Sequence, residues 1–227
     1  MEKVRIKDLI EFRQKSERSR HTHIINLKKE KPPKTDDKGG GGDYWVSCLS
    51  ALSNVYHTDD TDLINQKIEM LQNKIPITTD KKTKDRWQKN IDLLYNFGDY
   101  DFKSIKPNDD LTFLKKHDFQ SIIKIDGLPI QSKPHHVFSY TNNDFEEVGA
   151  VWFIAQKDGY QKSELGMFCD IMYRYLIAHY SDKYKVNPAF CIAIDVFNCQ
   201  DVNYSQLLNG EIAYLLDSTV IDVKKFL

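Results

Sequence analysis

A cysteine at the start of an expected helix is the first side chain in this sequence whose position suggests chemistry. Cys48 follows a run of glycines and the aromatic residues Tyr44 and Trp45, and apolar residues then recur at three- and four-residue intervals. A thiol near a helix N-terminus lies close to the positive end of the helix dipole, which favours the thiolate. Far downstream, His135 and His136 open an apolar, β-rich segment. A thiolate and a histidine are the pair that nucleophilic hydrolysis requires.

This order of elements resembles papain-type hydrolases, in which a helix-borne cysteine meets a histidine on a later hairpin. The resemblance implies a thiol hydrolase with Cys48 as nucleophile and His135 or His136 as base, oriented by Gln156 or Asp158. The sequence departs from the family pattern, because no tryptophan follows Cys48, no clear oxyanion-hole glutamine precedes it and no Asn-Ser-Trp follows the second strand. A buried helical cysteine and a histidine pair at a strand edge remain an alternative interpretation.

Acidic residues around an expected hairpin suggest a second chemistry, metal-dependent phosphodiester hydrolysis. Asp144, Glu146 and Glu147 lie in or beside the hairpin, and Lys157 ends its second strand. Carboxylates hold Mg²⁺, and a lysine can position the attacking water. The order strand, strand, helix, strand over residues 136–197 resembles nucleases of the restriction-endonuclease type, which implies a site of Asp144, Glu147 and Lys157. Apolar residues stand where that family places an acid before the lysine, so the same fold without its metal site also fits the sequence.

Two further patterns are too incomplete to predict a ligand site. Adjacent residues on a strand point to opposite faces, so His135 and His136 cannot easily share one metal ion, and no His-Glu-x-x-His pattern is present. The glycines 39–42 lack the Gly-Lys-Ser/Thr ending of a phosphate-binding loop. We therefore predict no metal and no cofactor.

The longest expected helix, residues 163–181, is the candidate for an interaction surface. Its apolar residues recur at helical spacing, and the side chains outside that stripe include tyrosines and an arginine. Such a composition is typical of protein interfaces, although ordinary amphipathic packing also explains it. The candidate binding residues are Tyr173, Arg174, Tyr180 and Tyr184, and Arg174 is expected to be exposed.

Charge is distributed unevenly along the chain. The net charge is −1, yet residues 1–38 hold 12 lysines and arginines against 7 acidic residues. A basic arm of this kind can contact nucleic acid or an acidic protein partner. The four cysteines lack the spacing of a zinc or redox motif, and no apolar run approaches the roughly 20 residues of a membrane helix. These features predict a soluble, cytoplasmic protein without a membrane contact.

The pattern of apolar residues predicts an α+β fold. We expect a flexible basic arm and Pro/Gly linker over residues 1–42 and a single globular domain over 43–227. In that domain a helical N-terminal half packs against one mixed, hairpin-containing sheet with one long helix in the C-terminal half. Residues 28–42 contain two prolines and four glycines, which favour an irregular linker.

Binding is the function that we expect from this sequence, because each catalytic pattern lacks an essential member. The leading hypothesis is a non-enzymatic subunit of an intracellular multi-protein complex. In general appearance the chain resembles accessory components of bacterial defence or mobile-element systems. The alternatives are the Mg²⁺-dependent nuclease and the papain-like thiol hydrolase. A protein partner is expected, and nucleic acid is a second candidate through the basic arm.

Overall fold

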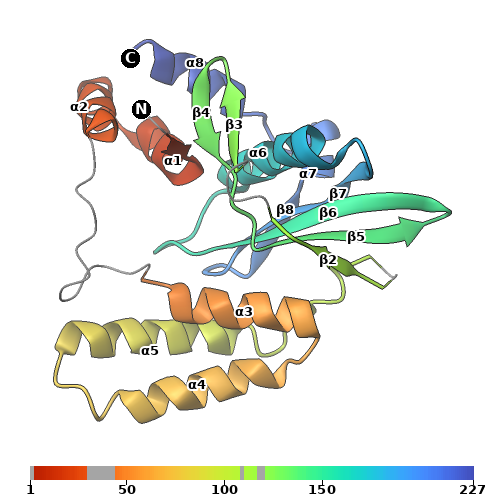
Figure 1. Ribbon diagram of the computed structural model, residues 1–227. Helices are drawn as coiled ribbons and strands as arrows, with labels where there is room; N and C mark the ends of the chain where they lie inside the picture. Colours follow the sequence, from red (N-terminus) through yellow and green to blue (C-terminus); the bar gives the residue numbers. More distant parts are fainter. Residues whose placement is uncertain (1–2, 30–43, 108–109, 117–120) are drawn as a thin grey trace.

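Helices make up the N-terminal half of the described chain and alternate with strands in the C-terminal half, which confirms the predicted α+β class (Figure 1). The computed structural model describes residues 3–29, 44–107, 110–116 and 121–227. The helices in these ranges are α1 (Ile6–Gln14), α2 (Glu17–Lys28), α3 (Val46–Thr58), α4 (Asp62–Lys74), α5 (Lys81–Asn96), α6 (Lys162–Tyr180), α7 (Tyr204–Leu208) and α8 (Leu216–Lys224).

The strands of the described residues form two sheets, where the sequence predicted one. A five-stranded sheet has the order β2 (Thr112–Leu114), β5 (His136–Asn142), β6 (Phe145–Ile154), β7 (Lys185–Asp195) and β8 (Gln200–Asn203). A three-stranded sheet has the order β1 (Val4–Arg5), β4 (Leu128–Gln131) and β3 (Ile122–Ile125). In the larger sheet, β6 and β7 are parallel and α6 connects them, whereas the other pairs are antiparallel.

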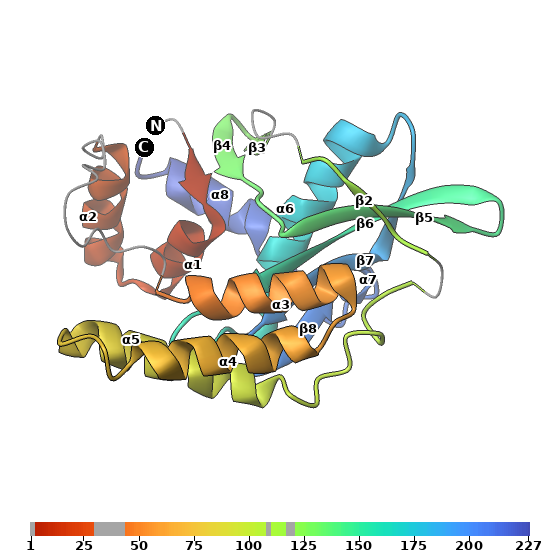
Figure 2. The ribbon, with the colours of Figure 1, turned by 60° about the horizontal axis from the view of Figure 1, so that its bottom comes forward.

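Strand β6 sends its buried side chains alternately into two layers of helices. Val148, Ala150 and Ile154 belong to the core that contains α6, whereas Val151 and Phe153 belong to the core that contains α3, α4 and α5. This alternation follows from the two-residue period of a strand. Figures 1 and 2 show α3–α5 on one side of the large sheet and α6 on the other. A strand covered on both faces reads as a nearly continuous apolar run.

The expected mobile arm is wrong for residues 4–28. Val4, Leu9 and Phe12 are almost fully buried and share a core with α6 and α8. The many charged residues of this segment lie around a short apolar stripe, which buries against the rest of the fold and supplies the stabilising free energy. The linker predicted for residues 28–42 falls mainly outside the described residues.

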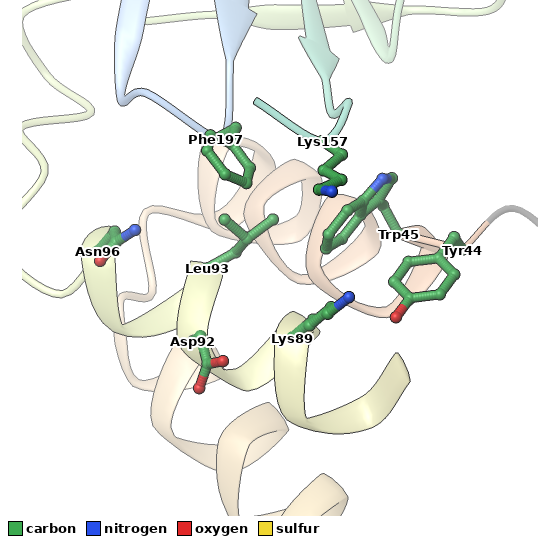
Figure 3. Close-up of a pocket in the computed structure, with 8 residues that line it drawn as sticks. All are labelled: Tyr44, Trp45, Lys89, Asp92, Leu93, Asn96, Lys157 and Phe197. Carbon is green, nitrogen blue, oxygen red and sulfur yellow. The ribbon is translucent and has the colours of Figure 1, made fainter. Parts of the chain in front are cut away.

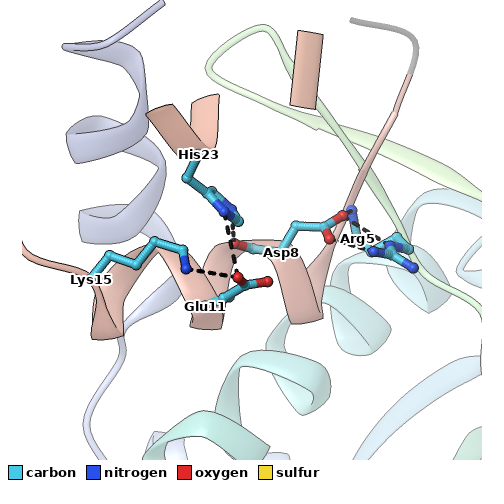
Figure 4. Close-up of polar contacts among 5 residues, drawn as sticks. All are labelled: Arg5, Asp8, Glu11, Lys15 and His23. Carbon is cyan, nitrogen blue, oxygen red and sulfur yellow. Dashed lines mark hydrogen bonds and ion pairs between the residues drawn. The ribbon is translucent and has the colours of Figure 1, made fainter. Parts of the chain in front are cut away.

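Polar contacts fix the N-terminal helices to each other (Figure 4). Arg5 Nε donates to Asp8 Oδ2 over 2.9 Å, and Lys15 Nζ forms a 2.8 Å ion pair with Glu11. His23 Nε2 on α2 lies 2.9 Å from the carbonyl oxygen of Asp8 on α1. These contacts hold Arg5 at the start of α1, beside the small sheet.

The small sheet depends on a pairing between distant parts of the chain. Strands β3 and β4 form a hairpin whose turn residues, Asp126 and Gly127, both have positive φ angles, as a tight turn of this type requires. Strand β1 then pairs in parallel with β4, Val4 opposite Ile130 and Arg5 opposite Gln131. Neither β4 nor its pairing with β1 was predicted from the sequence. No helix in the described ranges is long and apolar enough to cross a membrane.

Candidate anion-binding cleft and neighbouring aromatic pocket

A cleft opens where β1, the end of β4 and the β5–β6 hairpin meet. It consists of two adjacent hollows of about 360 and 310 Å³. The residues that line both hollows are Lys116, Gln131, Lys133 and Pro134. The parallel pairing of β1 with β4 brings the N-terminal segment to this place, so residues from three distant parts of the sequence form one wall.

Among the residues that the structure describes, four cationic side chains line this cleft and no acidic side chain does. They are Arg5, Lys7, Lys116 and Lys133. Arg5 forms an ion pair with Asp8 at 2.5 Å, and Asp8 stands behind it on α1. Lys7 Nζ donates to a backbone carbonyl oxygen at the end of β6 over 3.2 Å, and Lys116 Nζ donates to a carbonyl oxygen of the β4–β5 loop over 2.8 Å.

His135 lines the cleft, and its surroundings lower the pKa of its ring. Burial, together with the charges of Lys116 and Lys133, lowers the pKa of His135 to about 3. The ring is therefore neutral near pH 7. Its Nδ1 accepts the backbone N–H of Phe153 over 3.2 Å, so the neutral ring carries its proton on Nε2. His135 thus supplies a hydrogen-bond donor to a site that otherwise holds cations.

Ser132 is a buried hydroxyl on the wall of the smaller hollow. It is 1% exposed, and its Oγ has no hydrogen-bond partner among the described residues. Its backbone N–H donates to the carbonyl oxygen of Ser121 over 2.7 Å, which fixes the position of the residue. A buried hydroxyl without a partner is costly by roughly 1–3 kcal/mol, so a polar ligand in the hollow would relieve that cost.

A second pocket, which we call the aromatic pocket, lies between α3, α5 and the loops that follow β6 and β7 (Figure 3). It has a volume of about 530 Å³. The rings of Tyr44, Trp45 and Phe197 line it together with Lys89 and Lys157. Figure 3 shows the two amino groups close to the Trp45 ring, with the carboxylate of Asp92 farther away.

A buried carboxylate positions the two loops that contribute to the aromatic pocket. Asp195, at the end of β7, is fully buried, and its Oδ2 accepts the backbone N–H of Tyr160 and the side-chain amide of Asn198, both over 2.8 Å. Its Oδ1 accepts the backbone N–H of Phe197 over 3.0 Å. Gly159 has a φ of 71°, and a side chain there would collide with Asn198. These contacts join the loop that carries Lys157 to the loop that carries Phe197.

The residues predicted for thiol hydrolysis occupy different surroundings from those expected. Cys48 is fully buried; its Sγ lies 3.2 Å from the carbonyl oxygen of Trp45 and its backbone N–H donates to Asn90 on α5. His136 Nε2 lies 2.8 Å from both Oγ and the carbonyl oxygen of Ser53. Ser53 is five residues beyond Cys48, about 7.5 Å along the helix and roughly 140° around it. Asp158, the expected orienting residue, lies in the loop after β6.

The structure does not bring the predicted nuclease residues together. Asp144 lies in the hairpin turn with a φ of 68°, and Glu147 is buried near that turn. Lys157 follows the opposite end of β6, and the strand from Glu147 to Ile154 alone spans about 23 Å. Within the described residues, no three His, Cys, Asp or Glu side chains are grouped so that they could hold a metal ion.

Glu147 instead has a structural role at the hairpin. It accepts hydrogen bonds from Tyr140 at 2.7 Å and from Asn187 at 2.6 Å, and it forms a 3.0 Å ion pair with Lys185. Burial alone would raise its pKa, but these hydrogen bonds outweigh burial and hold the pKa at about 2. The carboxylate therefore joins β5, β6 and β7.

The expected interaction surface on α6 is largely occupied by contacts within the protein. The expectation that Arg174 is exposed is wrong, because its side chain is 31% exposed and forms ion pairs with Asp170 at 2.8 Å and Asp217 at 2.7 Å. Tyr173 stacks on Tyr204 with ring centroids 4.1 Å apart.

The other two tyrosines of this predicted surface are also partly or fully covered. Tyr180 is 6% exposed, and its hydroxyl donates to a backbone carbonyl oxygen over 3.3 Å. Tyr184 is half-buried beneath the ammonium group of Lys183, which lies 5.0 Å from the ring centroid. The composition of the helix therefore reflects packing onto neighbouring elements.

No protein-family model, curated protein or solved structure matches this chain.

Sequence reasoning missed most of the cleft. Arg5 and Lys7 were assigned to an arm, and Lys116, Ser132 and Lys133 were not singled out. The signal that could have found them is the tight-turn dipeptide 126–127, which implies a second strand over 128–131. The open end of that hairpin brings Lys116, which precedes its first strand, near Lys133, which follows its second. In the aromatic pocket, the sequence analysis considered Tyr44, Trp45 and Lys157, but in other roles.

Proposed function

We propose that this protein is a non-enzymatic binding subunit whose basic cleft holds a phosphate-bearing partner. The observation that carries the proposal is the convergence of Arg5, Lys7, Lys116 and Lys133 on one cleft, whose described lining residues include no acidic side chain. The proposal keeps binding as the function expected from the sequence and moves the contact surface from α6 to the cleft.

The uncharged groups of the cleft support an anionic ligand. Ser132 Oγ and the Nε2–H of His135 can each donate a hydrogen bond, and donors beside fixed cations are the arrangement that phosphate oxygens prefer. Because His135 is neutral, protonation of its ring is not needed for binding near pH 7. Arg5 can present two parallel N–H donors even while Asp8 holds its other side.

Calorimetric titration with inorganic tripolyphosphate tests this proposal. We expect binding to the wild-type protein at low ionic strength and a loss of more than about tenfold in affinity for the double variant Lys7→Glu/Lys133→Glu, because each contact to a charged group contributes about 1.5–3 kcal/mol. The matched control is Lys74→Glu on α4, an exposed charge reversal away from the cleft. Equal affinity for the double variant and the control would refute the cleft as the binding site.

A further inference from the structure

The basic cleft and the aromatic pocket are neighbours along two elements. On the first turn of α3, Trp45 lines the aromatic pocket and Leu49 lines the cleft. These residues are one helical turn apart, about 6 Å along the axis. At the end of β6, Ile154 lines the cleft and Lys157 lines the aromatic pocket. The two hollows therefore follow one another along a single edge of the molecule.

A lysine side chain makes the contact between the two hollows. Lys7 Nζ from the cleft donates to the carbonyl oxygen of Ala155, which lies between the two lining residues of β6 and its loop. On the far side, Lys89 lies 5.8 Å from the ring centroid of Tyr44, and within the described residues the ammonium group of Lys157 has no ion pair. Lys89 and Lys157 outnumber the one acidic residue among the described lining residues, Asp92, so the aromatic pocket keeps a net positive charge next to the cleft.

Ring-shaped ligand groups suit the aromatic pocket. Tyr44 and Trp45 meet edge to face, with centroids 4.7 Å apart, and Phe197 lines the pocket from the β7–β8 loop. Tyr44 is 36% exposed, so its ring is accessible. Nearby lysines add attraction for a negatively charged group attached to such a ring. A planar, anionic ligand meets both requirements.

We propose that the cleft and the aromatic pocket together form a path for a single-stranded nucleic acid, with phosphates on the cleft cations and a base stacked in the aromatic pocket. This inference rests on the proposed anion-binding function, because the cleft supplies the phosphate contacts. Grooves that bind single strands combine a positively charged track with aromatic side chains for the bases. A base inside a duplex is stacked on its neighbours and cannot enter a concave pocket.

The test compares a strand that has bases with one that has none. Fluorescence anisotropy is measured with labelled oligothymidylate and oligouridylate of about 12 nucleotides, a length within the range that one such groove covers, and with an abasic deoxyribose-phosphate strand of equal length. We expect the strands with bases to bind at least about fivefold more tightly, since stacking on aromatic residues contributes about 1–3 kcal/mol per base.

Variants separate the two parts of the path. Tyr44→Ala/Phe197→Ala should reduce the affinity for oligothymidylate to that for the abasic strand and leave abasic binding unchanged. Lys7→Glu/Lys133→Glu should weaken both. A 5-bromouridine strand should also photo-crosslink to Trp45 or Phe197 in the folded wild-type protein, which gives a readout without substitution.

The outcomes distinguish this inference from the proposed function. Equal affinity for thymidylate and abasic strands, with sensitivity to the cleft variant, would overturn the base-stacking inference and leave the anion-binding function in place. No binding of any strand or of tripolyphosphate would refute both. Tighter binding of an acidic peptide such as oligoglutamate than of either oligonucleotide would overturn the inference in favour of a protein ligand.

Discussion

The polar cluster on α6 and the basic cleft both contain cationic side chains, but only the cluster on α6 pairs its cation with two carboxylates. Arg174 lies between Asp170 and Asp217, so its positive charge is balanced by side chains of the same protein. In the cleft, Lys7 and Lys133 line a hollow in which no carboxylate is found among the described lining residues. Charges satisfied within the protein stabilise the fold, whereas charges of one sign around a hollow attract a ligand. The comparison shows why residue composition alone does not distinguish a cluster of internally paired charges from cations that line a hollow.

The largest effect on stability should come from removing Arg174, which forms ion pairs with Asp170 and Asp217. Arg174→Ala leaves the carboxylate of Asp170, which is 1% exposed, without its partner and should lower the free energy of unfolding by about 3 kcal/mol. Denaturant unfolding measures the change. The control Lys183→Ala removes an exposed cation near the end of the same helix and should stay within about 0.5 kcal/mol of wild type. An unchanged midpoint for Arg174→Ala would contradict a structural role for this arginine.

A smaller effect is expected where a buried carboxylate supports the aromatic pocket. Asp195→Asn places an amide donor against one of the N–H groups that the carboxylate accepts, and should cost about 1–3 kcal/mol of stability. It should also weaken oligothymidylate binding more than tripolyphosphate binding, because the loops of Lys157 and Phe197 lose their common anchor. Asp99→Asn, at an exposed position, is the control. Equal weakening of both ligands by Asp195→Asn would mean that the carboxylate does not act through the aromatic pocket.

The cleft should make stability depend on pH. The pKa of His135 in the folded protein is about 3 and its ordinary value is 6.5, so the unfolded chain binds a proton in that interval and the folded chain does not. Stability should therefore be complete above about pH 6.5 and fall as the pH is lowered toward 3. His136, with a pKa of about 4, acts in the same direction.

The matched measurement is urea unfolding between pH 7 and 5. His135→Asn, whose amide oxygen can replace Nδ1 as the acceptor for Phe153, should give a weaker pH dependence than wild type. A steeper dependence, or no difference, would show that the pKa of His135 is not lowered in the folded protein.

Local patterns in the sequence were sufficient for most of the large elements. The spacing of apolar residues predicted α3, α4, α5 and α6 because each helix buries one stripe against a neighbour. The β5–β6 hairpin was likewise predicted from two apolar runs around polar turn residues. These features depend on residues close together in the chain, so periodicity carries the information.

The cleft could not be predicted in the same way, because it depends on a non-local pairing. The sequence around Val4 and Arg5 does not indicate that these residues pair with Ile130 and Gln131. Without that pairing, the basic N-terminal segment is expected to be a flexible arm. The same limit applies to Arg174, whose partner Asp217 lies on α8. Both errors concern contacts between residues that are distant in the sequence.

The smallest expected change, in the salt dependence of binding, is also the most direct test of the cleft. The slope of that dependence is proportional to the number of cations that contact phosphates. Four cleft cations predict a slope of about −3 when the logarithm of the oligothymidylate association constant is plotted against the logarithm of salt concentration, at about 0.7 per cation for a single strand. Lys133→Ala should make the slope shallower by about 0.7 while leaving the unfolding midpoint unchanged. A slope near zero for wild type, or an unchanged slope for Lys133→Ala, would contradict the proposal that the cleft cations contact the phosphates.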